Sequence, residues 1–430
     1  MQSRRNFLAG ATTVGALGLA PALSGCASTT RNAAGKGKVV IVGAGYGGST
    51  AAKYIRDWSG NTIEVTVVEP GDDFVSCPVS NLVIAGAKSM QDITTSYDAL
   101  RGRHGVTWIK SMVESIDPAA RTVKLANGDS LKYDKLVVSP GIDLMYDTVK
   151  GLKAANESGK ILISMKAGPE TVALRKQIEA MPDGGVFALT VPKAPYRCPP
   201  GPYERASLVA AYFKKHKPKS KVIIFDANDK VQSKEPLFKK AWAEMYGGMV
   251  EYVPDHNVVG VNTQTMEAEF EVDAPVKADV LNIIPMQRAG VIAQRTGLSN
   301  MNGRWCAVDY RTFESTVHKD IHVLGDSIQI SPLMPKSGHM ANQQAKVAAA
   351  AIVSMLYDQP INPSPVVMNT CYSMVSFHQA IHVATVHQYS EKDKTFLTVP
   401  GSGGISAGLS DVEAHYAEAW ATNIWRDTLS

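Results

Sequence analysis

Three glycines near the start of the chain have the spacing of a phosphate-binding turn. Residues 38–42 are apolar and strand-like. They are followed, ahead of a segment of helical composition, by Gly43, Gly45 and Gly48. In such a unit the first glycine permits a tight turn, the second lets the backbone approach a pyrophosphate, and the third allows close helix packing. Because free N–H groups at a helix N-terminus favour anions, we expect a dinucleotide site.

An acidic residue supports this interpretation. Residues 63–68 form a second strand-like segment that ends at Glu69, about twenty residues past Gly48. A carboxylate in this place can accept hydrogen bonds from ribose hydroxyls. The glycines alone would also suit an ordinary parallel strand–helix–strand unit. Strand, turn, helix, strand and acid together favour a bound dinucleotide.

Two distant segments indicate which dinucleotide is bound. Residues 133–141 resemble the strand and turn that close the first flavin-domain segment in the glutathione-reductase superfamily. Residues 321–326 resemble the second FAD motif of that superfamily, in which an acid at a strand end contacts the ribityl and pyrophosphate part of FAD. Alone, Gly325 and Asp326 would suit a plain turn. The three motifs in this order favour FAD, with both residues among its contacts.

A second strand–helix–strand pattern covers residues 185–226, but its turn has no glycine pattern. The turn holds several prolines, together with Tyr196, Arg197 and Cys198. Proline lacks the N–H group that a phosphate cradle needs, and the three side chains would keep a pyrophosphate from the backbone. We therefore predict a nucleotide-type domain that binds no NAD(P).

Cys198 precedes an expected helix start at Gly201, and Glu204 lies in its first turn. A thiol just ahead of a helix N-terminus would have its thiolate favoured, as a redox or nucleophilic cysteine requires. Alternatively, Cys198 is a small buried hydrophobe and Glu204 only complements the helix dipole. Position alone does not separate these interpretations.

The N-terminus has the features of a twin-arginine export signal. Arg4 and Arg5 precede an apolar run that ends near Ala22, so we exclude this segment from the fold and expect a periplasmic protein. The segment that ends at Cys26 resembles a lipobox, which leaves open a lipid anchor at that cysteine as the only membrane attachment. Exported cysteines can be oxidised, so we expect Cys198 to have a partner.

Four motifs resemble the flavoprotein subunit of flavocytochrome c sulfide dehydrogenase, over nearly the whole mature chain. These motifs are residues 77–81, 196–205, 334–338 and 369–373. The resemblance implies that Cys77 carries FAD through a covalent thioether. It also implies that Cys198 and Cys371 form a redox disulfide beside the flavin, with Glu204 nearby. Cys306 is assigned no role and is expected to be a buried thiol.

The same resemblance implies a substrate and a partner. Hydrosulfide would attack the disulfide, leaving a persulfide and a thiolate, and electrons would pass through the flavin singly to haem. The chain has no CxxCH motif, so the haem would belong to a c-type cytochrome partner. Two alternatives stay open: a sulfide:quinone oxidoreductase, and a non-catalytic flavin-bearing electron-transfer or sulfur-carrier subunit.

A long helix is expected after Gly338, from about residue 340 to residue 356. Its N-terminal end could face the flavin and stabilise the reduced form, so Gly338 is an expected cofactor contact. Lys336 could add positive charge there. A second helix is expected over residues 414–425, with its tryptophans in the core or against the cytochrome.

The fold class that follows is α/β, with two Rossmann-like domains and a small α+β C-terminal domain. The FAD domain is discontinuous and the second, NAD-type domain lacks the NAD motif. The expected segments are the signal and linker (1–35), the first FAD segment (36–148), the NAD-like domain (149–277), the second FAD segment (278–358) and the C-terminal interface domain (359–430).

Composition and motif content give no support for nucleic-acid binding or for a metal site. The formal net charge of +4 is too near balance to indicate a nucleic-acid partner. No metal site is expected, because the chain has no CxxC pair and His378, His382 and His387 lie in a strand-like segment.

Overall fold

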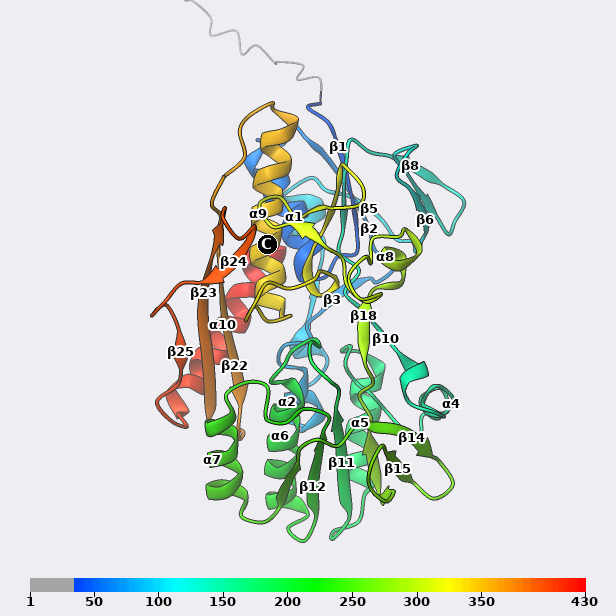
Figure 1. The fold of residues 1–430 in the computed structure, drawn as a ribbon, viewed down its shortest axis with the longest axis vertical. Coiled ribbons are helices and arrows are strands. Elements are labelled where there is room, and N and C mark those ends of the chain that lie inside the picture. Colours follow the sequence, from blue (N-terminus) through cyan, green and yellow to red (C-terminus); the bar gives the residue numbers. More distant parts are fainter. Residues whose placement is uncertain (1–34) are drawn as a thin grey trace, which may run out of the picture. The chain divides into compact units, whose positions relative to one another are not determined.

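The computed structural model describes residues 35–430 (Figure 1). The expected export signal and Cys26 lie outside this range. Within it, no helix combines the length and apolar character needed to cross a bilayer.

The first Rossmann-like domain is built on a seven-stranded sheet in the order β19-β20-β21-β9-β1-β2-β5. Its parallel strands are β1 (Lys38–Val42), β2 (Glu64–Val68), β5 (Thr107–Ile109), β9 (Lys135–Val138) and β21 (Ile321–Val323). Antiparallel strands β19 (Val308–Asp309) and β20 (Glu314–Ser315) complete one edge. Because β21 pairs with β9, a late part of the chain completes a sheet begun near residue 38, and the discontinuous FAD-type domain is confirmed.

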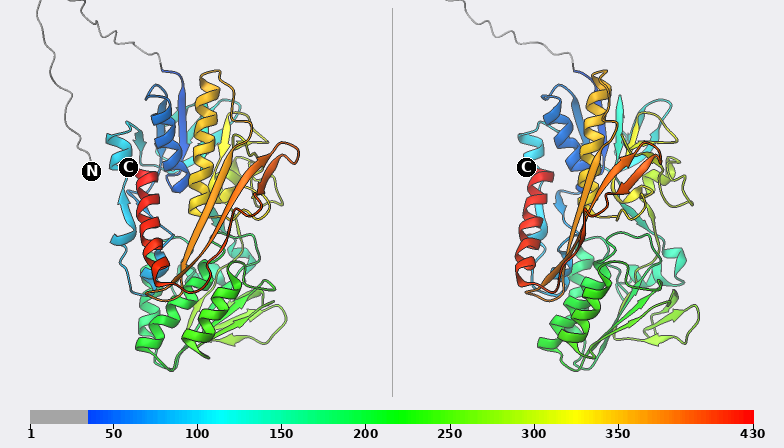
Figure 2. Two further views of the ribbon diagram at one scale, coloured as in Figure 1. Left: turned by 90° about the vertical axis from the view of Figure 1, so that its left-hand side faces the viewer. Right: turned by 60° about the vertical axis from the view of Figure 1, so that its left-hand side comes forward.

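Two helices pack side by side against this sheet: α1 (Tyr46–Trp58) and α9 (Gly338–Leu356) (Figures 1 and 2). Small buried residues on both helices permit the close approach, among them Ala51 and Ala52 on α1 and Ala345 and Ala348 on α9. The contact places both helix N-termini at the same end of the sheet, since each follows a parallel strand.

The second Rossmann-like domain has a four-stranded parallel sheet in the order β13-β12-β11-β17. The strands are β11 (Val186–Val191), β12 (Lys221–Asp226), β13 (Val250–Val253) and β17 (Val280–Asn282). Its main helices are α5 (Pro169–Ala180), α6 (Gly201–His216) and α7 (Glu235–Tyr246). Phe187, Phe213 and Phe238 are fully buried in its core. This confirms the second nucleotide-type domain.

The C-terminal part is an antiparallel sheet covered by a helix, as expected for a small α+β domain. Its elements are β22 (Val366–Met374), β23 (Ala380–Ser390), β24 (Thr395–Thr398), β25 (Gly404–Ile405) and α10 (Asp411–Leu429). Figure 2 shows α10, in red, beside α1.

Shorter elements complete the fold. The strands are β3 (Asp73–Val75), β4 (Thr94–Ser96), β6 (Val113–Asp117), β7 (Thr122–Leu125), β8 (Ser130–Lys132), β10 (Ile142–Leu144), β14 (Val258–Asn262), β15 (Glu267–Phe270), β16 (Val276–Lys277) and β18 (Gln287–Ala289). The α-helices are α2 (Ser80–Ile84), α3 (Asp98–Gly102), α4 (Leu152–Glu157) and α8 (Val291–Arg295). The 3-10 helices are η1 (Gln91–Ile93), η2 (Tyr146–Thr148) and η3 (Gly325–Ser327).

Asp427 connects the C-terminal end of α10 to α1 and α9 through hydrogen bonds and an ion pair. Its carboxylate accepts hydrogen bonds from Tyr54 Oη at 2.5 Å and Asn342 Nδ2 at 2.7 Å, and Lys346 Nζ lies at 2.8 Å. Partial burial acts to raise the pKa of Asp427, but these three partners outweigh burial and hold the pKa below its usual value.

We predict that Asp427→Ala lowers the free energy of unfolding at pH 7 by about 2 kcal/mol, because charge-assisted hydrogen bonds are lost. Since the folded state lowers this pKa, the contribution is present above the ordinary carboxyl pKa and declines as the pH falls below it. Urea unfolding at pH 7 and at acid pH measures both effects. Asp411→Ala, an exposed carboxylate at the other end of α10, should cost less than about 1 kcal/mol. Equal losses for the two variants would contradict the anchoring role.

Candidate active site

The glycine turn between β1 and α1 has the geometry of a phosphate cradle. Gly43 has a φ of +88°, and a Cβ added there would lie 2.5 Å from the carbonyl oxygen of Ser139. A Cβ on Gly48 would lie 1.8 Å from the carbonyl oxygen of Gly43, so both glycines are required by the protein itself. A Cβ on Gly45 would meet no protein atom within 4 Å. Gly45 therefore leaves open space at the start of α1, which fits a pyrophosphate.

Glu69 lies directly beside this turn. Its carboxylate accepts hydrogen bonds from the main-chain N–H groups of Ala44 at 2.8 Å and Gly71 at 2.9 Å. These bonds orient the carboxylate at the carboxyl end of β2, and each of its oxygens keeps a further lone pair. The geometry fits an acceptor of ribose hydroxyls.

Asp326 has a buried carboxylate oxygen without a partner in the protein. Gly325 turns the chain after β21 with a φ of +73°. Asp326 Oδ2 lies 3.2 Å from Arg197 Nε, whereas Oδ1 is buried and has no hydrogen-bond partner among residues 35–430. Because buried polar atoms are nearly always paired, a ligand hydroxyl would satisfy this oxygen. The motif residues thus fit FAD at three separate points.

Lys336 lies behind Asp326. Its ammonium donates to the main-chain carbonyls of Asp326 and Ile328 and lies 3.5 Å from the centre of the Trp305 ring. Burial lowers the pKa of Lys336 to about 7. The lysine supports the segment that carries Asp326, so its charge at the flavin stays a prediction.

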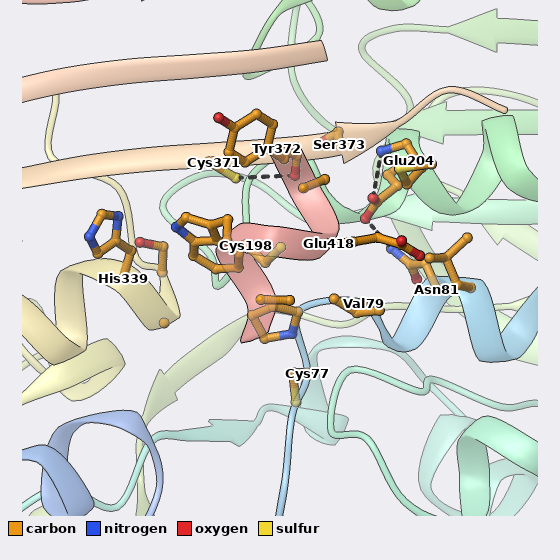
Figure 3. A pocket seen from close by; sticks show the side chains of 18 of the residues that line it. Cys77, Val79, Asn81, Cys198, Glu204, His339, Cys371, Tyr372, Ser373 and Glu418 are labelled. Atoms are coloured by element: carbon orange, nitrogen blue, oxygen red, sulfur yellow. Dashed lines mark hydrogen bonds between the residues drawn. The ribbon is translucent and has the colours of Figure 1, made fainter. Parts of the chain in front are cut away.

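A second feature is a cavity of about 320 Å³ where the two Rossmann-like domains meet the C-terminal sheet and α10. Its lining includes Cys77, Cys198, Glu204, Gly338 and Cys371. Figure 3 shows Cys371 on β22, Cys198 below it and Cys77 farther down the same cavity. The structure therefore brings together residues that are almost 300 positions apart in the chain.

Cys198 and Cys371 are both free thiols in this structure, so the disulfide stays a prediction. Burial raises the pKa of the Cys198 thiol well above its usual value, and Cys371 and Glu204 add to this effect. The start of α6 would favour the Cys198 thiolate, whereas desolvation and the two neighbouring acids favour the neutral thiol. Burial also raises the pKa of Cys371.

Glu204 is more than a helix-dipole residue. Its carboxylate accepts hydrogen bonds from Met374 N and from Asn81 Nδ2, both at 2.8 Å. Burial raises its pKa in spite of these two bonds. Glu204 thus joins α6 to β22 and to α2, the helix that follows the Cys77 loop, and it is positioned to hold a proton beside the cysteines.

Two residues within the sequence motifs had no predicted role in the FAD or sulfide site. Asn81 donates to Glu204 and also to the carbonyl of Gly201 at 3.1 Å, so it orients the acid. Arg197 forms the ion pair with Asp326 and donates to the carbonyl of Met165 at 3.2 Å. Both residues could be found only by their place in the cysteine motifs.

Cys77 lies in the loop between β3 and α2, and its sulfur accepts a hydrogen bond from Ala167 N at 3.2 Å. Cys306, by contrast, is fully buried outside this cavity, as expected for a thiol without a role. Trp420 and Trp425 of α10 are partly buried against the core of the first domain, in agreement with the expected core placement, and they also line the cavity. Trp425 Nε1 donates to Tyr46 Oη at 3.0 Å.

Comparisons with known families cover three parts of the chain. Residues 37–171 match the family described as pyridine nucleotide-disulphide oxidoreductase. Residues 171–285 match the central domain of the sulfide dehydrogenase (flavocytochrome c) flavoprotein chain, and residues 363–429 match the flavin-binding domain of flavocytochrome c sulphide dehydrogenase.

Individual relatives agree with these matches. The flavoprotein chain of flavocytochrome c sulfide dehydrogenase from Chlorobaculum thiosulfatiphilum is 51% identical over 49 residues, which are 11% of this chain and 100% of that sequence. Mitochondrial sulfide:quinone oxidoreductase from Dictyostelium discoideum is 26% identical over 334 residues, covering 76% of this chain and 72% of that protein. The structure of sulfide:quinone oxidoreductase from Aquifex aeolicus shares the fold, with a TM-score of 0.73, 18% identity and 91% of each chain covered.

We predict different outcomes for alanine at two glycines of the turn. Both variants are tested in a Cys77→Ala background, so that the expected thioether at Cys77 cannot retain the flavin. Gly45→Ala should fold normally but bind FAD at least about tenfold more weakly, because its methyl group enters the open cradle. Gly48→Ala should lower the free energy of unfolding by about 1 to 3 kcal/mol, because its methyl group meets the backbone. FAD titration and urea unfolding measure these effects, and unchanged FAD binding in Gly45→Ala would exclude the cradle.

Proposed function

Because this chain belongs to the family of flavocytochrome c sulfide dehydrogenase flavoprotein chains, we propose that it oxidises hydrosulfide at Cys198 and Cys371 and passes electrons singly to a c-type cytochrome. It is a flavin-dependent, sulfide-oxidising oxidoreductase. One observation carries the proposal for the site: two cysteines from distant segments line one cavity with a partly buried acid, Glu204. That cavity adjoins the residues that fit FAD.

The cysteine pair reacts in its disulfide form. Hydrosulfide attacks one sulfur, the S–S bond breaks, and the products are a persulfide on one cysteine and a thiolate on the other. The proton of hydrosulfide stays on the persulfide or passes to Glu204, whose raised pKa suits a proton acceptor beside sulfur. Strand β22, helix α10 and the Cys198 loop form walls of the cavity in which this step takes place.

FAD, when bound, takes up two electrons together and releases them one at a time, which a one-electron haem acceptor requires. The chain would hold FAD through Gly43, Gly45 and Gly48 at the pyrophosphate and through Glu69 at the ribose. Gly325 and Asp326 would hold the ribityl end, and Gly338 would lie beside the ring system at the N-terminus of α9. Lys336 would keep the segment that carries Asp326 in place through its hydrogen bond to the main-chain carbonyl of Asp326.

A cytochrome is favoured over a quinone as the electron acceptor. Residues 363–429 supply the β22 and α10 walls of the cavity, and they match a flavocytochrome c domain. Quinone is the second candidate, because relatives aligned with about three quarters of this chain are sulfide:quinone oxidoreductases. We also propose that the protein is periplasmic after twin-arginine export, and either cleaved near Ala22 or lipid-anchored at Cys26.

We predict that sulfide bleaches the visible flavin absorbance of the purified protein and that adding a c-type cytochrome restores it while haem becomes reduced. Cys198→Ser and Cys371→Ser should each slow bleaching at least about 1,000-fold, because a reacting group is lost. Cys306→Ser, outside the cavity, is the matched control. Stopped-flow absorbance measures both steps. Reoxidation by a soluble quinone alone would favour the second acceptor, and no bleaching would favour a non-catalytic subunit.

We predict that Cys77 carries the flavin covalently. After acid denaturation and gel filtration, the wild-type chain should keep its flavin fluorescence and Cys77→Ala should release it. Cys198→Ala is the matched control, since it lines the same cavity, and it should keep the flavin. Retention of flavin by denatured Cys77→Ala would assign the attachment to another residue.

A further inference from the structure

Lys234 is a buried cation beside the cysteine pair. It lies immediately before α7 with 5% of its surface exposed. Its Nζ donates a hydrogen bond to the main-chain carbonyl of Cys371 at 3.0 Å. Among residues 35–430 this is the one hydrogen bond recorded for the ammonium, which carries three N–H donors. A buried ammonium with spare donors is costly unless a negative charge forms next to it.

The backbone of Lys234 supports a role for its side chain. Lys234 adopts φ 55° and ψ 33°, the left-handed region that favours glycine or asparagine. For a lysine this conformation is unfavourable. Its side chain makes no capping hydrogen bond to α7, so helix capping does not explain a lysine in this place.

The charge of Lys234 acts on three acidic groups: Cys371 on β22, Cys198 in the loop before α6, and Glu204 in α6. Burial raises the pKa of all three, and the Lys234 charge opposes that effect on each of them. For Cys371, the charge of Lys234 is the main effect that lowers the pKa against the rise caused by burial. The cation is therefore already in place before any sulfur becomes charged.

Sulfide attack brings negative charge into this buried region. Hydrosulfide enters with one negative charge, the S–S bond breaks, and the electron pair stays on the sulfur that leaves. One sulfur becomes a persulfide and the other a thiolate, so the total charge is unchanged but has moved from water into the protein. Desolvation opposes that transfer unless a fixed cation is present.

We propose that Lys234 is the fixed counter-charge of the cysteine pair and stabilises the anionic sulfur formed when hydrosulfide opens it. This inference rests on the proposed function. Because Lys234 contacts the carbonyl of Cys371, it is a positioning residue that acts through the electrostatic field at the sulfur. Its effect should appear as a change in the acidity of Cys371.

The test measures how fast Cys371 is alkylated by iodoacetamide as a function of pH, in the flavin-loaded, exported protein carrying Cys198→Ser. Peptide mass spectrometry isolates the modification of Cys371. The other titratable or charged side chains that line the cavity with Cys371 are Cys77, Lys88, Asp92, Arg197, Glu204, His339, Tyr372 and Glu418. Burial lowers the pKa of His339 and raises the pKa of Tyr372, and the modified peptide reports the Cys371 thiol itself. Adding Lys234→Gln removes the charge but keeps a donor for the Cys371 carbonyl.

We expect Lys234→Gln to raise the apparent pKa of Cys371 by at least about one unit, which lowers its alkylation rate at pH 8 about tenfold. Lys234→Arg should restore most of the rate, because it restores the charge. Lys217→Met is the matched control: Lys217 also donates to a main-chain carbonyl, that of Glu179 at 2.9 Å, but away from the cysteines. An unchanged Cys371 profile in folded Lys234→Gln would overturn the inference.

A separate measurement keeps this inference distinct from the proposed function. In the chain with both cysteines, Lys234→Gln should slow sulfide-dependent flavin bleaching about tenfold or more, and Lys234→Arg should recover it. If Cys371→Ser still bleached normally, the proposed function would fail, whatever the alkylation result. If Cys371→Ser abolished bleaching while Lys234→Gln left alkylation and bleaching unchanged, only the role of Lys234 would fail.

Discussion

The reactive cavity depends on one junction between the two Rossmann-like domains. The N–H group of Cys198 donates to the carbonyl of Lys336 at 2.9 Å, and the ion pair between Arg197 and Asp326 lies beside it. Two neighbouring residues of this loop therefore make different contacts. Cys198 binds the segment before α9, and Arg197 binds Asp326, the acid that fits the ribityl chain of FAD. A shift of this loop would move the sulfur and the cofactor contacts together. The Cys198 sulfur therefore has a defined place only while the domains stay joined here.

Burial sets the chemistry of this cavity, and a few fixed groups offset its cost. Desolvation raises the pKa of Cys198, Cys371 and Glu204, so the cavity favours neutral sulfur and a protonated or strongly hydrogen-bonded acid. Asn81 provides a hydrogen bond to the acid, and Lys234 provides a cation beside the sulfur pair. A site of this kind can be reactive toward an anion only because such partners are already in place before the anion enters.

Much of the nucleotide-binding part was predictable because its signals are local. Gly43, Gly45 and Gly48 act within one strand, turn and helix, so their spacing alone defined their roles. The absence of a glycine pattern around Cys198 likewise predicted a nucleotide-type domain with a different turn. The acidity of Cys198 could not be predicted, because its sequence neighbours show the helix start but not the burial or the nearby Cys371.

The sequence by itself determined the fold class, the dinucleotide turn and the cysteine motifs, since hydrophobic pattern and turn chemistry act over a few residues. Tertiary structure alone decided which of these residues meet. Parallel pairing of β21 with β9 brings Asp326 to the sheet that carries the glycine turn, and β22 brings Cys371 to the Cys198 loop. Lys234 has no sequence signal at all, because a buried charge is recognised only by what surrounds it. Packing decides desolvation, and desolvation decides the charge of sulfur and acid in this cavity.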